Sequence, residues 1–146
     1  MLFADHGYPA LAAAAPATPV QYRAMLEGRR TLVATDPRDV AIGLAITEQL
    51  GQVEWLCELS VHPDHGRRGV GAALLEAVAD AARRRGCDRI GLSTFRAVPF
   101  NAPFYAANGF GALALGRAEY PLADRFHAEV PAGVAPGKRV LMVRAL

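Results

Sequence analysis

The sequence predicts a single α/β domain with about six strands and one long helix. Three observations support this prediction. The chain has 146 residues, enough to bury one ordinary core without disulfides or metals. Its composition, 52% hydrophobic and 21% charged, is typical of a globular protein. Short apolar runs separated by turn residues recur along the chain, and one amphipathic segment of helical periodicity lies between the third and fourth runs.

Charge and composition exclude several classes of protein. Sixteen Lys and Arg against fourteen Asp and Glu leave a net charge of +2, too small for a general nucleic-acid binder or an electrostatic membrane anchor. The two cysteines, Cys57 and Cys87, are too few for a disulfide framework, and the four histidines are too scattered for a metal site. With neither an apolar run long enough to span a membrane nor a secretory signal, we expect a soluble cytoplasmic protein, monomeric or homodimeric, without nucleic-acid, membrane or metal partners.

The expected elements follow one another regularly from residue 30 onward. Residues 1–30 are expected to form short helical segments, because prolines interrupt an alanine-rich stretch. Strands are expected at residues 31–35, 40–47, 53–61, 89–94, 110–115 and 140–144. A long helix is expected at 69–85, a short helix at 101–107, and a loop rich in Pro, Ala and Gly at 116–137.

The strand expected at 53–61 has the most informative pattern. Its odd positions form one apolar face at period two: Val53, Trp55, Cys57, Leu59 and Val61. Glu54 and Glu58 occupy even positions, and His62 follows in the same alternation. These polar side chains either cover the wet outer face of a rim strand or line a cleft. A β-bulge would change which way the later residues face.

The segment after this strand is predicted to bind an anion. It reads Gly66-Arg67-Arg68-Gly69-Val70-Gly71-Ala72 and leads into the long helix. The first N–H groups of a helix have no intrahelical partner and lie at the positive end of its dipole. Gly69 and Gly71 leave those groups open to approach, and Arg67 and Arg68 add donors suited to phosphate. A pyrophosphate fits this pattern, although a tight turn with packing glycines explains the loop alone equally well, and the spacing matches neither a P-loop nor a dinucleotide fingerprint.

Two longer segments resemble motifs of the GNAT superfamily of N-acetyltransferases. Residues 59–75, LSVHPDHGRRGVGAALL, resemble its acyl-CoA-binding motif, a strand ending in Val-His-Pro followed by Arg/Gln-x-x-Gly-x-Gly/Ala at the start of a helix. Gly69 and Gly71 fall on the two glycine positions. Gly66 stands where the family usually has Arg or Gln, so only its backbone N–H is available there. Residues 101–110, NAPFYAANGF, resemble the family's Asn-x-x-x-Tyr-x-x-x-Gly-Phe stretch.

The resemblance implies a mixed sheet with helices on both faces, in one domain spanning residues 1–146. Residues 1–30 are short for the strand and two helices that the family places there, so we expect the first strand to be missing or vestigial. The acyl-CoA-binding and catalytic core would lie within 53–115. Acetyl-CoA is the implied co-substrate, with no metal, and the expected binding residues are Leu59, Val61, Gly66, Arg67, Arg68, Gly69, Val70, Gly71, Ala72, Asn101 and Tyr105.

Acetyl transfer from a thioester to an amine needs a base, an oxyanion donor and an acid. An alkylammonium has a pKa of about 10.4, so a base must collect its proton at neutral pH. Glu58 is the preferred base, with Glu54 and His62 as alternatives. The resemblance assigns the oxyanion donor to the Val61 N–H and the acid that protonates the leaving thiolate to Tyr105. The alternatives are a core aromatic for Tyr105 and a helix N-cap for Asn101.

These residues predict an N-acetyltransferase that moves an acetyl group from acetyl-CoA to the primary amine of a small molecule, by direct attack in a ternary complex. Two alternatives stay open on the sequence. One is a non-catalytic acyl-CoA-binding module, and the other is a peptide or protein N-acetyltransferase.

Overall fold

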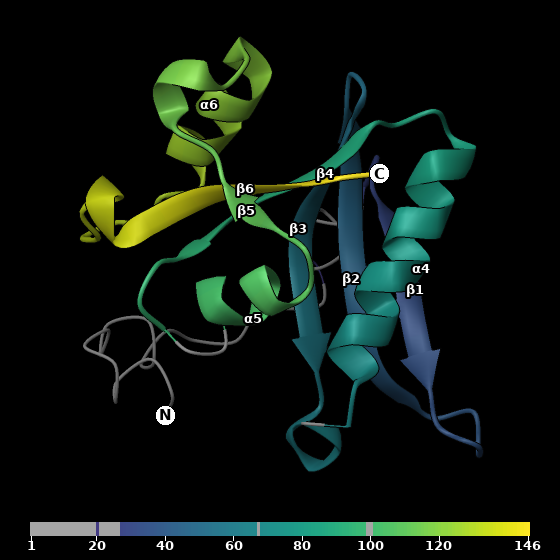
Figure 1. The fold of residues 1–146 in the computed structure, drawn as a ribbon. Coiled ribbons are helices and arrows are strands. Elements are labelled where there is room, and N and C mark those ends of the chain that lie inside the picture. Colours follow the sequence, from purple (N-terminus) through teal and green to yellow (C-terminus); the bar gives the residue numbers. More distant parts are fainter. Residues whose placement is uncertain (1–19, 21–26, 67, 99–100) are drawn as a thin grey trace.

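A mixed six-stranded sheet forms the centre of the computed structural model, which describes residues 20, 27–66, 68–98 and 101–146 (Figure 1). The strands are β1 (Arg30–Thr35), β2 (Ala41–Leu50), β3 (Val53–Val61), β4 (Arg89–Phe95), β5 (Gly111–Ala112) and β6 (Arg139–Ala145). They lie in the order β1-β2-β3-β4-β6-β5, and every pair is antiparallel except β3 with β4. The predicted sheet of about six strands is confirmed.

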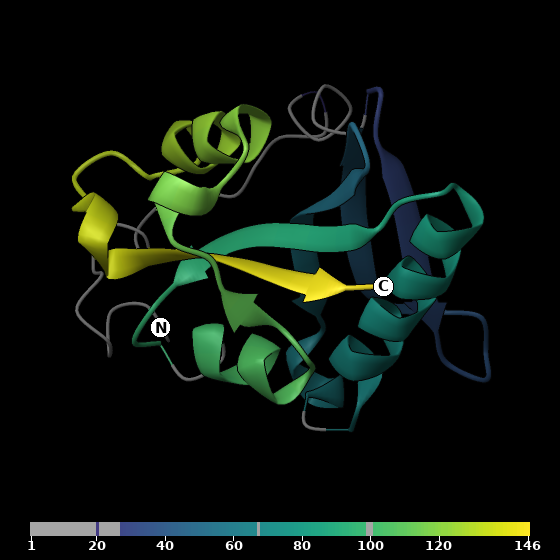
Figure 2. The ribbon, with the colours of Figure 1, turned by 45° about the horizontal axis from the view of Figure 1, so that its top comes forward.

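Helices pack on both faces of this sheet, as expected (Figures 1 and 2). Helices α4 (Val70–Arg84) and α5 (Ala102–Ala107) share one core, which includes Leu75, Val78 and Tyr105. Helix α6 (Tyr120–Ala128) covers the other face with Leu122 and Phe126. Short 3-10 turns occupy Pro63–His65, Leu115–Arg117 and Pro136–Lys138. Among the described residues, no helix has the length and apolarity needed to cross a membrane.

A β-bulge interrupts the pairing of β2 with β3. Ile46 lies opposite Glu58, whereas the next residue, Thr47, lies opposite Leu56. Cys57 is therefore an extra residue on β3. An extra residue of this kind bends the strand and shifts its side-chain alternation by one position.

Because of the bulge, the odd-numbered residues in the two halves of β3 face opposite sides of the sheet. Trp55 and Cys57 pack on the α6 face, whereas Leu59 and Val61 pack on the α4 face. The single apolar face expected at the odd positions from 53 to 61 is therefore wrong, and alternation places Glu54 and Glu58 on opposite faces. The alternative of a wet rim strand is also wrong, because β3 lies inside the sheet between β2 and β4.

The segment expected as a loop at 116–137 contains α6, which is a second correction. Leu122 and Phe126, one helical turn apart, are 1% and 2% exposed and pack against Trp55. The spacing of these two residues could have predicted the helix from the sequence, but the many Pro, Ala and Gly residues around them favoured a loop. β5 is shorter than the strand expected at 110–115, because the chain turns into a 3-10 helix at Leu115. The helical segments and vestigial strand expected in residues 1–30 fall mostly on residues 1–19 and 21–26, outside the described residues.

Trp55 requires a glycine beside it in the sheet. It is fully buried and lies opposite Gly91 of β4. A Cβ atom built on Gly91 would lie 3.2 Å from Trp55 Cε3 and 3.2 Å from Val53 Cγ1. Both neighbours belong to the packed core under α6, so neither has room to yield.

We expect Gly91→Ala to lower the free energy of unfolding by about 1–3 kcal/mol, because the added methyl group overpacks the indole. Urea denaturation followed by tryptophan fluorescence measures this loss. Gly111→Ala in β5 is the control, since no atom lies within 4 Å of the added Cβ there. Equal stability of the two variants would contradict this packing role.

Candidate active site

Strands β3 and β4 diverge soon after they begin. Their parallel pairing covers only Val53–Arg89, Glu54–Ile90 and Trp55–Gly91. Beyond these pairs a hollow of about 280 Å³ opens between the strands, and we call it the splay hollow. Its lining includes four residues predicted from the sequence and two that were not: Glu58, Leu59, Asn101 and Tyr105, then Thr94 and Arg139.

The splay hollow draws side chains from both faces of the sheet. Leu59 and Tyr105 belong to the core beneath α4. Glu58 faces the α6 side, because it precedes Leu59 in the strand alternation. Arg139 lies on that side too, since its guanidinium sits 4.6 Å above the Phe95 ring and bonds to Ser93. The hollow is therefore bordered by residues from both faces of the sheet.

The backbone of β3 presents hydrogen-bonding groups to the splay hollow. His62 N–H donates to the Ile42 carbonyl across the β2 ladder, with an N–O distance of 2.7 Å. Since successive residues in an antiparallel ladder point their N–H groups to opposite sides, the Val61 N–H points away from β2. Leu59 has the same orientation, two residues earlier. β4 has already diverged at this point, so both N–H groups face the gap.

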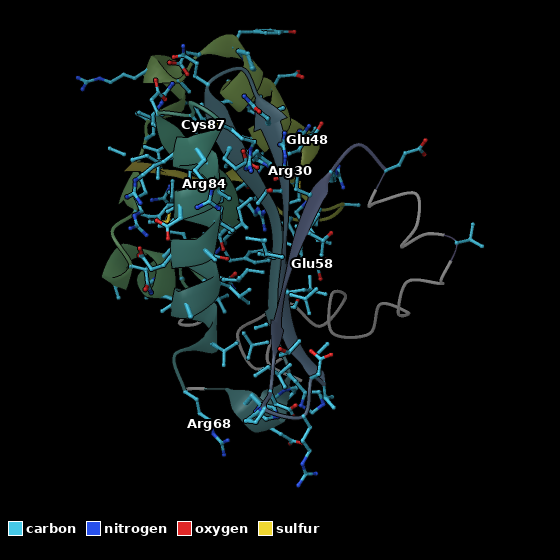
Figure 3. All side chains as sticks on the ribbon, turned by 90° about the vertical axis from the view of Figure 1, so that its right-hand side faces the viewer. Arg30, Glu48, Glu58, Arg68, Arg84 and Cys87 are labelled. Carbon is cyan, nitrogen blue, oxygen red and sulfur yellow. The ribbon has the colours of Figure 1, made fainter. Side chains whose placement is uncertain are left out.

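Helix α4 begins with free amides beside this gap. Its N-cap, Gly69, adopts a left-handed conformation with φ of 80° and makes no side-chain cap. Ala73 N–H is the first to donate within the helix, to the Gly69 carbonyl, so three preceding amides lack an intrahelical partner: Val70, Gly71 and Ala72. Arg68 is exposed just before the helix (Figure 3). Arg67 lies outside the described residues.

Each of the three glycines in this segment has a different place in the structure. Gly69 needs its conformation, because L side chains rarely adopt a positive φ. Gly71 needs its missing side chain, because a Cβ there would lie 3.2 Å from Phe104 Cζ of α5. At Gly66 the N–H already donates to the Pro63 carbonyl at 3.2 Å. In the structure this N–H therefore closes the turn, whereas the sequence led us to expect that it would bind an anion.

Asn101 is held by a residue that the sequence did not single out. The buried Thr94 hydroxyl donates to Asn101 Oδ1 at 2.7 Å, and Asn101 makes no side-chain cap to α5. Asn101 Nδ2 is buried and has no hydrogen-bond partner among the described residues. A donor fixed in this way suits an amide carbonyl of a bound molecule, since an unpaired buried N–H is costly. The alternating pattern of side chains along β4 was the sequence feature that could have pointed to Thr94.

Tyr105 is both a core residue and part of the splay hollow. Its ring is 9% exposed and makes edge contacts with Phe104 and Phe110. Its hydroxyl has no hydrogen-bond partner among the described residues, and burial raises its pKa to about 12. The hydroxyl therefore stays protonated across the neutral range and can act as a proton donor.

Glu58 is the one carboxylate among the described residues that line the splay hollow. It is half-buried, and the Ser60 hydroxyl donates to its Oε1 at 2.9 Å. This bond orients the carboxylate and leaves Oε2 for another donor.

The two alternative bases lie elsewhere. Glu54 is fully buried on the α4 face, where Arg85 Nη2 lies 2.8 Å and Arg30 Nη1 3.7 Å from its Oε1. Cys87 Sγ lies 3.7 Å from the other oxygen. In Figure 3, Cys87 and Arg30 lie near one end of the sheet and Glu58 lies farther along it. His62 is exposed and accepts a bond from the Asp64 backbone N–H, outside the hollow.

The splay hollow thus brings residues of β3, β4, α5 and β6 together at one site. Residues 5–110 match the model of the Acetyltransferase (GNAT) family. The chain belongs to this family of acetyl-CoA-dependent acyltransferases, so the predicted family and fold are confirmed. Within the described residues, no group of three or more His, Cys, Asp or Glu side chains could hold a metal ion.

Individual relatives are distant. The tRNA(Met) cytidine acetyltransferase TmcA of Thermococcus sp. (strain AM4) is 32% identical over 90 residues, which cover 62% of this chain and 11% of that protein. The chain thus spans about a tenth of that relative's length. N-acetylglutamate synthase from Neisseria gonorrhoeae, solved with coenzyme A and N-acetylglutamate, gives a TM-score of 0.70 at 15% identity, over 99% of this chain and 32% of that one. The ribosomal-protein-S18-alanine N-acetyltransferase from Escherichia coli gives 0.66 at 22% identity, over 91% and 79%.

We expect Glu54→Gln to lower the free energy of unfolding by about 1–3 kcal/mol, because Arg85 and Arg30 lose a buried ionic partner. Acetyl-CoA affinity and the rate of any acetyl transfer per folded molecule should stay unchanged. Urea denaturation and isothermal titration measure the two effects. A variant with full stability but no acetyl transfer would instead identify Glu54 as the base.

Proposed function

We propose that this chain is an acetyl-CoA-dependent N-acetyltransferase that acetylates the primary amine of a small molecule by direct attack in a ternary complex. The main support is that the splay hollow collects a carboxylate from the α6 face and a protonated phenol from the α4 face. Glu58 and Tyr105 are thus available to one reacting centre from its two sides. A pure binding module needs neither group, so this pairing favours catalysis.

Acetyl-CoA fits the α4 side of the hollow and supplies the thioester. The amides of Val70, Gly71 and Ala72 would bind its pyrophosphate, as unpaired amides at a helix N-terminus bind anions, with Arg67 and Arg68 adding positive charge. Asn101 Nδ2 and the Leu59 N–H would bind amide carbonyls of the pantetheine arm. The unpartnered, buried Asn101 Nδ2 is the observation that supports this fit.

Glu58, Val61 and Tyr105 then divide the chemistry of transfer. Glu58 accepts the proton that the amine must lose, directly or through a water molecule. The amine nitrogen forms a bond to the carbonyl carbon, and the Val61 N–H stabilises the negative charge on the carbonyl oxygen. When the carbon–sulfur bond breaks, Tyr105 donates its proton to the thiolate and regains one from solvent, as Glu58 releases its own. The products are an N-acetylated amine and the free thiol of CoA.

An acceptor panel with CoA-thiol release as the readout tests this function. The panel contains small amines, short peptides and polyamines, and isothermal titration first establishes that acetyl-CoA binds. Release with small amines supports the proposal. Release with peptides alone would favour a peptide N-acetyltransferase, and binding without any release would favour the non-catalytic module.

We expect Glu58→Gln to lower kcat by about 10²- to 10⁴-fold at neutral pH, the usual range for loss of a general base. The loss should shrink as the pH approaches about 10, because the acceptor amine then loses its proton unaided. Initial rates from pH 6 to 10 measure this convergence, and acetyl-CoA affinity should not change. Glu54→Gln is the matched control. A deficit that stays constant across this pH range would contradict the role of base.

We expect Tyr105→Phe to lower kcat by about 10²-fold while leaving cofactor affinity intact. Stability should change by less than about 0.5 kcal/mol, because the hydroxyl bonds to no described residue and the ring contacts persist. Since burial raises the pKa of Tyr105 to about 12, the wild-type rate should show no decline near pH 10 from loss of this proton. Unchanged kinetics in the variant would remove Tyr105 from the mechanism.

A further inference from the structure

A second hollow, of about 520 Å³, lies against the start of β6, and we call it the side hollow. Arg139 lines both the side hollow and the splay hollow, so the two adjoin at this residue. Phe126 and Leu141, which belong to the core under α6, also line it. Because Glu58 faces the same side of the sheet, the side hollow neighbours the acceptor side of the proposed reaction centre.

The lining of the side hollow combines apolar walls with positive charge. Leu113, Leu115 and Phe126 are its larger apolar lining residues, and Arg96 and Arg139 are its charged ones. No carboxylate is among the described residues that line it. A ligand with an apolar body and an anionic group matches this lining, whereas the two arginines would repel a second ammonium group.

Both arginines make hydrogen bonds within the protein before any ligand arrives, and those of Arg139 hold its guanidinium in position. Arg139 Nη2 donates to the Ser93 carbonyl at 3.0 Å and to the Ser93 hydroxyl at 2.9 Å. Arg96 N–H donates to the Lys138 carbonyl at 2.9 Å, and its Nη2 lies 3.4 Å from the Arg139 carbonyl. Arg96 itself is exposed at the rim of the side hollow. Positioned cations lose less conformational entropy when an anion binds.

The charges of the two hollows are complementary to one kind of acceptor. Glu58 attracts an amine in the splay hollow, and Arg96 with Arg139 attracts an anion next to it. We propose that the acceptor is an amino acid with an apolar side chain, bound with its carboxylate at Arg96 and Arg139 and its side chain against Leu113, Leu115 and Phe126. The inference rests on the proposed function, because it names the substrate of the same site.

Kinetics with three matched acceptors test this proposal: leucine, leucinamide, which lacks the carboxylate, and 3-methylbutylamine, which lacks the whole carboxyl group. The wild-type protein should show its lowest KM with leucine. Arg96→Gln should raise the KM for leucine about 10-fold or more, because a hydrogen bond to an ion contributes about 1.5–3 kcal/mol and each 1.4 kcal/mol is tenfold. The KM for leucinamide and all kcat values should not change.

Arg84→Gln is the control, since it removes the same charge from the exposed side of α4, away from the hollow. A wild-type preference for leucinamide or 3-methylbutylamine would overturn the proposal. So would an Arg96→Gln effect that is equal for all three acceptors.

A binding measurement separates this inference from the proposed function. Isothermal titration compares N-acetylleucine with N-acetylleucinamide in the presence of CoA. N-acetylleucine should bind about 10-fold more tightly, and both Arg96→Gln and Leu115→Glu, which adds a carboxylate to the lining, should abolish the difference. Equal affinity overturns the inference even where amines are acetylated. A charge-dependent difference without acetylation of any amine supports the anion site and refutes the proposed catalytic function.

Discussion

The divergence of β3 from β4 is the constraint on which the rest of the structure depends. Parallel pairing ends after Trp55–Gly91. Two residues later, the extra residue Cys57 bends β3. Without the bulge, Glu58 would face the core under α4, and the carboxylate would be buried among apolar side chains. With it, Leu59 and Val61 face that core and Glu58 faces the other side. One inserted residue thereby separates Glu58 on the α6 side from the β3 side chains that face α4.

Packed side chains lie on either side of this divergence. Trp55 fills the α6 face where the strands still pair, and its Nε1 donates to Glu129 at 2.9 Å. Burial raises the pKa of the Glu129 carboxyl group, which the indole N–H and nearby arginines partly offset. At the other end, Phe104 of α5 packs where Gly71 lacks a side chain, which fixes the start of α4 beside the gap. The paired end of the two strands and the start of α4 are thus both tightly packed.

The two carboxylates of β3 are likewise divided between the two faces of the sheet. Glu54 is fully buried and pairs with Arg85 and Arg30, whose side chains are partly exposed, and none of the three residues lines either hollow. Glu58, by contrast, has only a serine hydroxyl as its described partner and keeps one oxygen available. Two carboxylates four residues apart on the same strand therefore have different surroundings. Glu54 is buried and ion-paired, and Glu58 lines the splay hollow.

The sequence by itself determined most of the elements, the family motifs and four of the residues around the splay hollow, because these depend on local periodicity and on contiguous residues. Asn101, Tyr105, Leu59 and Glu58 were all named from such patterns. Thr94 and Arg139 were not singled out from the sequence, since β4 and β6 are far apart in the chain and meet only in the sheet. The choice between Glu54 and Glu58 as the carboxylate beside the hollow likewise required the tertiary structure. Strict alternation puts both carboxylates on one face, and only the pairing with β2 reveals the bulge that separates them.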